Sequence, residues 1–160
     1  MGTGTVTGTR TATGTGLASS AVEVLVAVRN APSAAQVRAW IRRLLLEARA
    51  KRVSLSILLC GDSRMRSLNR EWQGIDLPTD VLSFCSGERE FLGDIVIDVS
   101  YAARQARRRG HTLAREVQIL LAHGLLHLLG YDHEEDDGTM FRRQRRILLS
   151  AFGEGPDGVP

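Results

Sequence analysis

The sequence predicts an α/β (α+β) protein with a mixed sheet of about four strands and helices packed on it. Short segments rich in valine, isoleucine and leucine alternate with segments whose apolar residues recur at helical spacing. In addition, segments 81–84 and 91–99 are joined by a short polar link, which is typical of an antiparallel hairpin. Layers of helix on a sheet bury the apolar faces of both elements.

Each element has its own signal. We expect strands at 22–28, 53–59, 81–84 and 91–99 from their aliphatic content. Helices are expected where capping residues precede an apolar stripe and glycine follows it. The expected helices are 33–50, 100–109, 112–129 and 139–151, together with one that begins at Asp62 or Ser63 and ends before Gly74. Ser33 caps the first helix, and Gly110 closes the helix at 100–109.

The helix at 112–129 is apolar on nearly every side, which predicts a central, buried position. It carries His123 and His127 at the edge of its main apolar stripe, where a buried helix would meet a cleft. The fold class therefore includes a central helix that bears two candidate metal ligands.

A chain of 160 residues with 43% hydrophobic residues fits one domain, which we place at residues 21–153. Residues 1–20 form a Gly/Thr-rich tail without an apolar face and are expected to be disordered, and residues 154–160 are expected to be a flexible C-terminal tail. The pattern contains neither a signal peptide nor the ~18 apolar residues of a membrane helix, so we expect a cytoplasmic protein without membrane contact. Cys60 and Cys85 are expected to be free thiols.

The net charge of +3 is mild, and every basic residue except Lys51 is arginine. Clusters at 104–109 and 142–146 suit phosphate binding, because guanidinium groups bind phosphate oxygens in pairs. A solvated helix face explains such clusters equally simply, and on charge alone we favour that interpretation.

Three of the four histidines, His123, His127 and His133, lie in one short segment. Positions i and i+4 share a helix face, and Gly130 ends the helix so that His133 can return as a third ligand. Three imidazoles leave a tetrahedral zinc ion one open position, which a catalytic water can fill. We predict one Zn²⁺ per chain, with other transition metals as alternatives, and a catalytic role for these histidines through the metal-bound water. A purely structural metal site is the other interpretation.

The string HGLLHLLGYDH at 123–133, together with Leu68-Asn69, PTDVLSF at 78–84 and LGDI at 92–95, resembles the YbeY family of bacterial rRNA maturation factors. The resemblance covers roughly residues 21–152. It implies a zinc-dependent endoribonuclease, specific for single strands, that acts in 3'-end maturation of small-subunit (16S) rRNA and in ribosome quality control. RNA and the ribosome or its proteins are the implied partners, and His123, His127 and His133 are the implied ligands.

Two positions depart from the family pattern. Gln73 stands where the family usually has an arginine thought to help activity, and Arg70, one turn away, is a candidate substitute; we take both as candidate substrate contacts. Cys85 replaces a common proline and is expected to be a structural strand-end residue. Three carboxylates, those of Asp80, Asp94 and Asp132, either orient an imidazole or serve local turns and strand ends.

The histidine pattern also allows two rival functions. Zinc metalloproteases place a catalytic glutamate directly after the first histidine, but Gly124 occupies that position, which counts against proteolysis. A non-catalytic ribosome-assembly factor with a structural metal site is the alternative, and the absence of the arginine at Gln73 keeps it open. The general base, and the choice between water and the RNA 2'-hydroxyl as nucleophile, stay open.

Overall fold

The computed structural model describes residues 20–132 and 137–153. Four strands, β1 (Val22–Val26), β2 (Ser54–Cys60), β3 (Val81–Cys85) and β4 (Phe91–Asp98), form one sheet in the order β1-β2-β4-β3. β1, β2 and β4 run parallel, whereas β3 pairs antiparallel with β4. The predicted mixed sheet and its hairpin are therefore confirmed.

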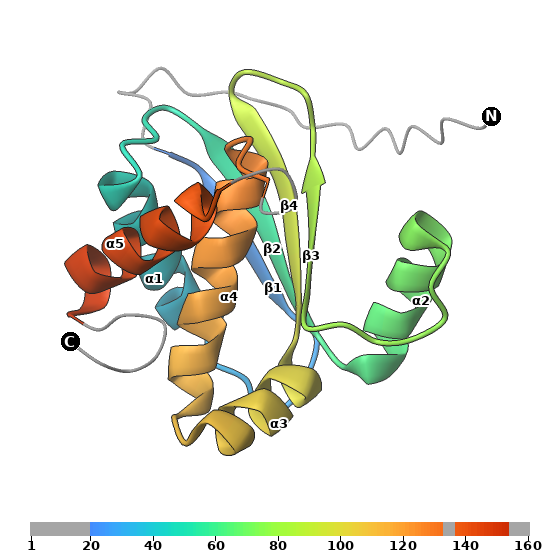
Figure 1. Ribbon diagram of the computed structural model, residues 1–160. Coiled ribbons are helices and arrows are strands. Elements are labelled where there is room, and N and C mark those ends of the chain that lie inside the picture. The colour runs from blue at the N-terminus through green and yellow to red at the C-terminus, as the bar shows by residue number, and fades with distance from the viewer. Residues whose placement is uncertain (1–19, 133–136, 154–160) are drawn as a thin grey trace.

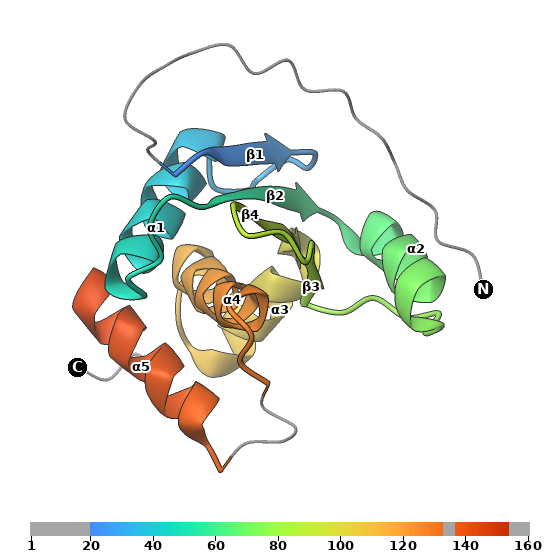
Figure 2. The same cartoon turned by 90° about the horizontal axis from the view of Figure 1, so that it is seen from above.

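Five helices surround this sheet within the described residues: α1 (Ala34–Glu47), α2 (Asp62–Gln73), α3 (Val99–Arg109), α4 (Leu113–Leu128) and α5 (Thr139–Phe152). Each lies within two or three residues of its expected position. α1 and α4 cover one face of the sheet, and α5 packs on the outer side of these two helices. α2 lies beyond β3 and β4 on the other side of the sheet (Figures 1 and 2). None of the described helices is long and apolar enough to cross a membrane.

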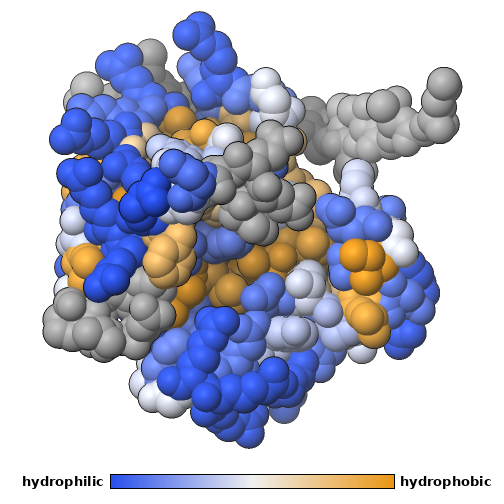
Figure 3. Space-filling view, in the orientation of Figure 1, coloured by the Kyte–Doolittle hydropathy of each residue, from blue (hydrophilic) through white to orange (hydrophobic). Residues whose placement is uncertain are grey.

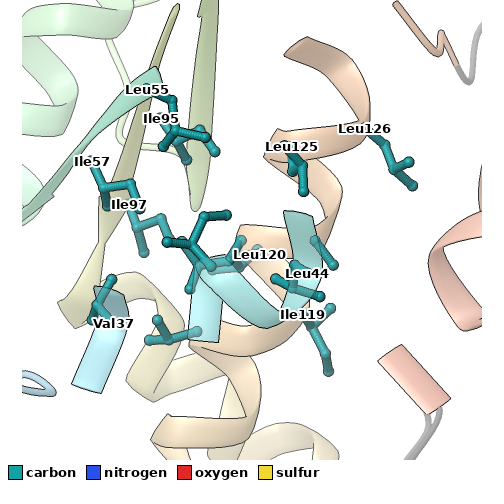
Figure 4. Packing of buried hydrophobic residues seen from close by; sticks show 14 of the residues in the cluster. Val37, Leu44, Leu55, Ile57, Ile95, Ile97, Ile119, Leu120, Leu125 and Leu126 are labelled. Atoms are coloured by element: carbon teal, nitrogen blue, oxygen red, sulfur yellow. The ribbon is translucent and has the colours of Figure 1, made fainter. Parts of the chain in front are cut away.

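The main core lies between the sheet and α4, as the apolar character of that helix predicts. Ile57, Ile95 and Ile97 point from β2 and β4 toward Leu120 and Leu125 of α4 (Figure 4). α1 lies beside α4 on the same face of the sheet and adds Val37 and Leu44 to this core. A smaller cluster packs α2 on the opposite face of the sheet through Cys60, Met65, Leu68 and Val96. The central position of α4 is confirmed.

Gly124 explains how closely α4 approaches the sheet. A Cβ atom at this position would lie 3.0 Å from Ile95 Cγ2 and 3.1 Å from Ser83 Oγ. A side chain larger than glycine would therefore require Ile95 and Ser83 to shift by a few tenths of an ångström. The close packing of α4 on β3 and β4 therefore adds a structural reason why a small residue suits this position, in line with the sequence evidence against the metalloprotease arrangement.

Candidate metal centre and groove

His123 and His127 come together on the sheet-facing edge of α4. Their ring centroids lie 4.6 Å apart, and their Nε2 atoms lie 3.0 Å apart. The i, i+4 spacing places both rings over the same turn of the helix, which is the arrangement the sequence predicts. Thr112 caps the N-terminus of this helix, because its hydroxyl accepts a hydrogen bond from the Arg115 amide at 3.1 Å.

A hydrogen bond to a residue of another helix orients His123. Its Nδ1 lies 3.1 Å from the amide oxygen of Gln144, which is buried on α5. With the amide oxygen as the acceptor, this contact corresponds to the tautomer of His123 that carries its proton on Nδ1. The lone pair of a neutral imidazole is then on Nε2, the atom that faces His127.

These two imidazoles fit a zinc ion. Two nitrogens bound to one tetrahedral zinc ion at about 2.0–2.1 Å lie roughly 3.3 Å from each other. The observed separation of the Nε2 atoms, 3.0 Å, is close to that value. Imidazole nitrogen also suits zinc and neighbouring transition metals.

The predicted third ligand, His133, lies outside the described residues. Among the residues that are described, no group of three His, Cys, Asp or Glu side chains is placed to hold one metal ion. The end of α4 does follow the prediction: Gly130 has a φ of +93°, and the Tyr131 amide donates to the Leu126 carbonyl at 3.0 Å. This glycine-terminated end turns the chain off the helix axis directly before Asp132 and His133.

A groove runs past the histidine pair. It consists of two cavities of about 620 and 670 Å³ that share Asp80, Val81 and His123. We call them the Gln73 end and the Phe141 end of the groove. Gln73, His127 and Asp132 line the first, and the lining of the second includes Arg109, His111, Phe141 and Gln144. The imidazole of His123 thus faces the middle of the groove.

The two candidate substrate contacts are placed differently. Gln73, the last residue of α2, lines the groove together with His127. Arg70 lies one turn earlier, with Nη1 3.6 Å from the Asp76 carboxylate and a side chain that is 64% exposed. The departure from the family pattern therefore falls directly on the groove, whereas Arg70 is engaged by an acidic neighbour.

Asp80 and Asp94 lie on different sides of the sheet. Asp80 lines both ends of the groove, and its oxygens accept hydrogen bonds from the Val81 amide at 2.8 Å and from Gln105 Nε2 at 2.9 Å. Asp94 instead accepts a hydrogen bond from Ser56 and lines a cavity on the α2 side of the sheet. Successive residues of a strand point to opposite faces of the sheet, and Asp94 points away from α4. The expectation that Asp94 orients an imidazole of the pair is therefore wrong, and its other expected role, as a local strand residue, is confirmed.

Two buried polar residues near the groove, Gln144 and Glu116, were not predicted from the sequence. Glu116 on α4 is fully buried and is bound by Arg109 Nη1 at 3.0 Å and by His111 Nε2. Two partners compensate a carboxylate that would otherwise be costly to bury. The sequence signal available was Glu116 on the apolar side of a buried helix, which implies a nearby cation. Gln144 was missed because one glutamine on an amphipathic helix carries no such signal.

The remaining charged clusters resemble ordinary surface pairs. Arg104 binds Asp62 through two contacts of 2.8 and 3.0 Å, and Arg142 binds Asp137 at 3.2 Å. The hydrogen bond to Arg104 lowers the pKa of Asp62. Burial, followed by the neighbouring Asp62, raises the pKa of Asp98 to about 6. The solvated-face interpretation of the arginine clusters holds for these pairs.

Both cysteines are free thiols, as expected. Burial raises the pKa of Cys60 to about 11, so this thiol stays protonated and unreactive at neutral pH. Cys85 ends β3, and its Sγ lies 3.6 Å from the His127 carbonyl oxygen. Its position at the end of a strand matches the structural role expected for it.

The fold and the groove define an α/β protein with a paired-imidazole site of the kind found in metal-dependent hydrolases. Comparison with known proteins gives the family. The model of the family "Endoribonuclease YbeY" matches residues 26–151, and this chain belongs to that family. YbeY endoribonucleases are hydrolases with roles in rRNA processing, and they form a metalloprotein family.

Individual proteins of this family are similar to the chain in sequence and in fold. The endoribonuclease YbeY of a Sulfurihydrogenibium species is 47% identical over 114 residues, which cover 66% of this chain and 75% of the relative. That of Gloeobacter violaceus is 41% identical over 144 residues, covering 81% and 74%. The solution structure of TM1509 from Thermotoga maritima superimposes with a TM-score of 0.63 at 26% identity, covering 82% of this chain and 89% of that structure.

Proposed function

We propose that this protein is a zinc-dependent endoribonuclease that cleaves single-stranded RNA, acting in 3'-end maturation of small-subunit rRNA and in ribosome quality control. His123, His127 and His133 are the proposed ligands of one Zn²⁺ per chain. The observation that carries the proposal is the histidine pair in the groove, with Nε2 atoms 3.0 Å apart and His123 oriented by Gln144. We place the protein in the cytoplasm, with rRNA and the ribosome as partners.

Zinc in this position supplies a Lewis acid for a phosphoryl oxygen and a means to lower the pKa of water. The residues of the chain orient the ligands and shape the groove. Gln144 fixes the tautomer of His123 so that Nε2 is the ligand atom. The walls of the groove, from β3 on one side and α5 on the other, restrict how an RNA strand can lie across the pair.

The alternative is a non-catalytic assembly factor whose metal only stabilises the fold. The specific observation in its favour is Gln73, which removes a cation from the groove itself. An amide binds a phosphate oxygen less strongly than a guanidinium does, because charge-assisted hydrogen bonds are roughly twice as strong as neutral ones.

One experiment separates the two functions. The purified full chain, loaded with Zn²⁺, is incubated with a labelled single-stranded RNA and with the same RNA in a duplex, with and without a chelator. We expect cleavage of the single strand that the chelator abolishes, and little cleavage of the duplex. A protein that retains zinc and its thermal midpoint but cleaves neither RNA would exclude the nuclease and leave the assembly factor.

A matched variant links that activity to the site. His123→Ala/His127→Ala should lose cleavage, whereas Leu46→Ala, which truncates an exposed side chain on α1, should keep it. Thermal midpoints measured in parallel identify any loss that reflects unfolding.

A further inference from the structure

Apart from Gln144 and the wall that α5 provides, the Phe141 end of the groove has no role in the function proposed so far. It is a cavity of about 670 Å³ that begins at His123 and is enclosed by α4, α5 and the residues that join α3 to α4. Cavities of about 300 to 1,000 Å³ are the ones that bind small organic ligands, and a nucleoside is a ligand of that size.

The floor of this cavity is apolar and its rim is aromatic. Ile119, Leu120 and Met140 are buried and form the floor, whereas the ring of Phe141 is 55% exposed at the rim. Figure 3 shows apolar residues gathered in a recess between the hydrophilic surfaces of α3, at the bottom, and of α5, at the left. A large apolar side chain left exposed beside a cavity is suited to stacking on a flat ligand.

The charges of the cavity favour a neutral ligand. Arg109 is already paired with the buried Glu116, and His111 binds the same carboxylate. Asp80 adds a further negative charge at the boundary with the rest of the groove. A phosphodiester gains little here, whereas a base can stack on an apolar surface and offer its polar edge to His111 and Asp80.

We propose that the Phe141 end of the groove is a nucleobase pocket, which takes one unpaired base of the RNA strand next to the phosphate at His123, with Phe141 stacking on that base. The inference rests on the proposed function. It also gives a reason for a preference for single strands, since a base inside a duplex must first leave its stack and its partner to enter the pocket.

The test combines abasic RNA with substitutions of Phe141. A set of short single-stranded RNAs carries one abasic nucleotide at successive positions around the cleavage site. With the zinc-loaded protein, cleavage should fall at one position adjacent to the cut by roughly 5- to 150-fold, the loss that corresponds to one base stacked on an aromatic side chain. Affinity for the same RNAs, measured by fluorescence anisotropy with chelator present, should fall at the same position.

Phe141→Ala should reduce affinity for the intact RNA by a similar factor and should remove the sensitivity to the abasic position. Phe141→Tyr should retain both, because the ring is kept. Leu46→Ala, an exposed apolar residue on α1, is the control and should behave as the unchanged protein.

The outcomes for the two proposals differ. Efficient cleavage with an equal response to every abasic position, or abasic sensitivity that persists in Phe141→Ala, would overturn the nucleobase pocket and leave the nuclease intact. No cleavage of any RNA, with position-specific binding that Phe141→Ala abolishes, would support the pocket and overturn the nuclease.

Discussion

Gln144 of α5 accepts a hydrogen bond from Nδ1 of His123 on α4 at 3.1 Å. This contact makes the packing of two helices part of the candidate metal centre. Because Gln144 is buried and α5 contacts both α1 and α4, the orientation of the imidazole depends on the docking of the last helix. Partners of this kind are worth about 10- to 100-fold in metal affinity in other metalloproteins.

Gln144→Met should therefore weaken zinc binding by about 10- to 100-fold, because methionine fills a similar volume but offers His123 no comparable acceptor. Gln144→Glu should bind zinc at least as tightly as the unchanged protein, since carboxylates commonly orient metal-bound histidines. Competition with a chromogenic chelator measures both affinities. Arg145→Met, at an exposed position on the same helix, is the matched control, and equal affinities in all four proteins would remove Gln144 from the site.

The purified protein should contain near-stoichiometric transition metal, and His123→Ala/His127→Ala should lose it, because the variant retains at most one of the three proposed imidazoles. Elemental analysis of both proteins, after equal dialysis, is the measurement. His133→Ala extends the test to the ligand outside the described residues. Equal metal content in the unchanged protein and the double variant would contradict the site.

Gln73→Arg should strengthen RNA binding or cleavage by about tenfold or more, because hydrogen bonds to charged groups contribute ~1.5–3 kcal/mol and residue 73 lines the groove. Arg70→Ala should have little effect, because Arg70 lies 3.6 Å from Asp76 and is largely exposed. Affinities for one single-stranded RNA at fixed salt compare the two variants. A large loss in Arg70→Ala that Gln73→Arg rescues would show instead that Arg70 supplies the missing cation.

Asp98→Asn should stabilise the fold above pH 6 and not near pH 4. The folded pKa of Asp98 is raised from 3.8 to about 6. Between those values the unfolded chain loses the proton while the folded chain keeps it, so this carboxyl lowers the free energy of unfolding as the pH rises. The full effect is on the order of 3 kcal/mol above pH 6, at 1.36 kcal/mol per pKa unit.

Asparagine retains the helix cap that Asp98 provides by accepting a hydrogen bond from the Tyr101 amide at 3.1 Å. Urea unfolding of both proteins at about pH 4 and pH 8 gives the comparison. A difference in stability that is the same at both pH values would show that ionisation of Asp98 does not cause it.

Deleting residues 2–19 should leave the thermal midpoint nearly unchanged, because this Gly/Thr-rich segment has no apolar face to bury. Differential scanning calorimetry of the full and shortened chains measures the midpoint. A drop of many degrees would mean that the segment packs on the domain.

Local patterns along the chain predict the elements and point to the candidate ligands. The positions of the four strands, the glycine-terminated end of α4 and the facing pair His123 and His127 all follow from local rules: alternation of apolar residues, capping, and the i, i+4 spacing on one helix. The long runs of matching motif residues predicted the family for the same reason, since they are read directly along the chain.

The residues that contact these ligands from distant parts of the chain could not be predicted from local patterns. The tertiary structure placed Gln144 on His123, Glu116 between Arg109 and His111, and Asp94 on the far face of the sheet from the histidine pair. It also decided that Phe141 borders the groove. The physical reason is that local sequence fixes the periodicity of each element, whereas the contacts of a polar side chain depend on how separate elements pack around the common core.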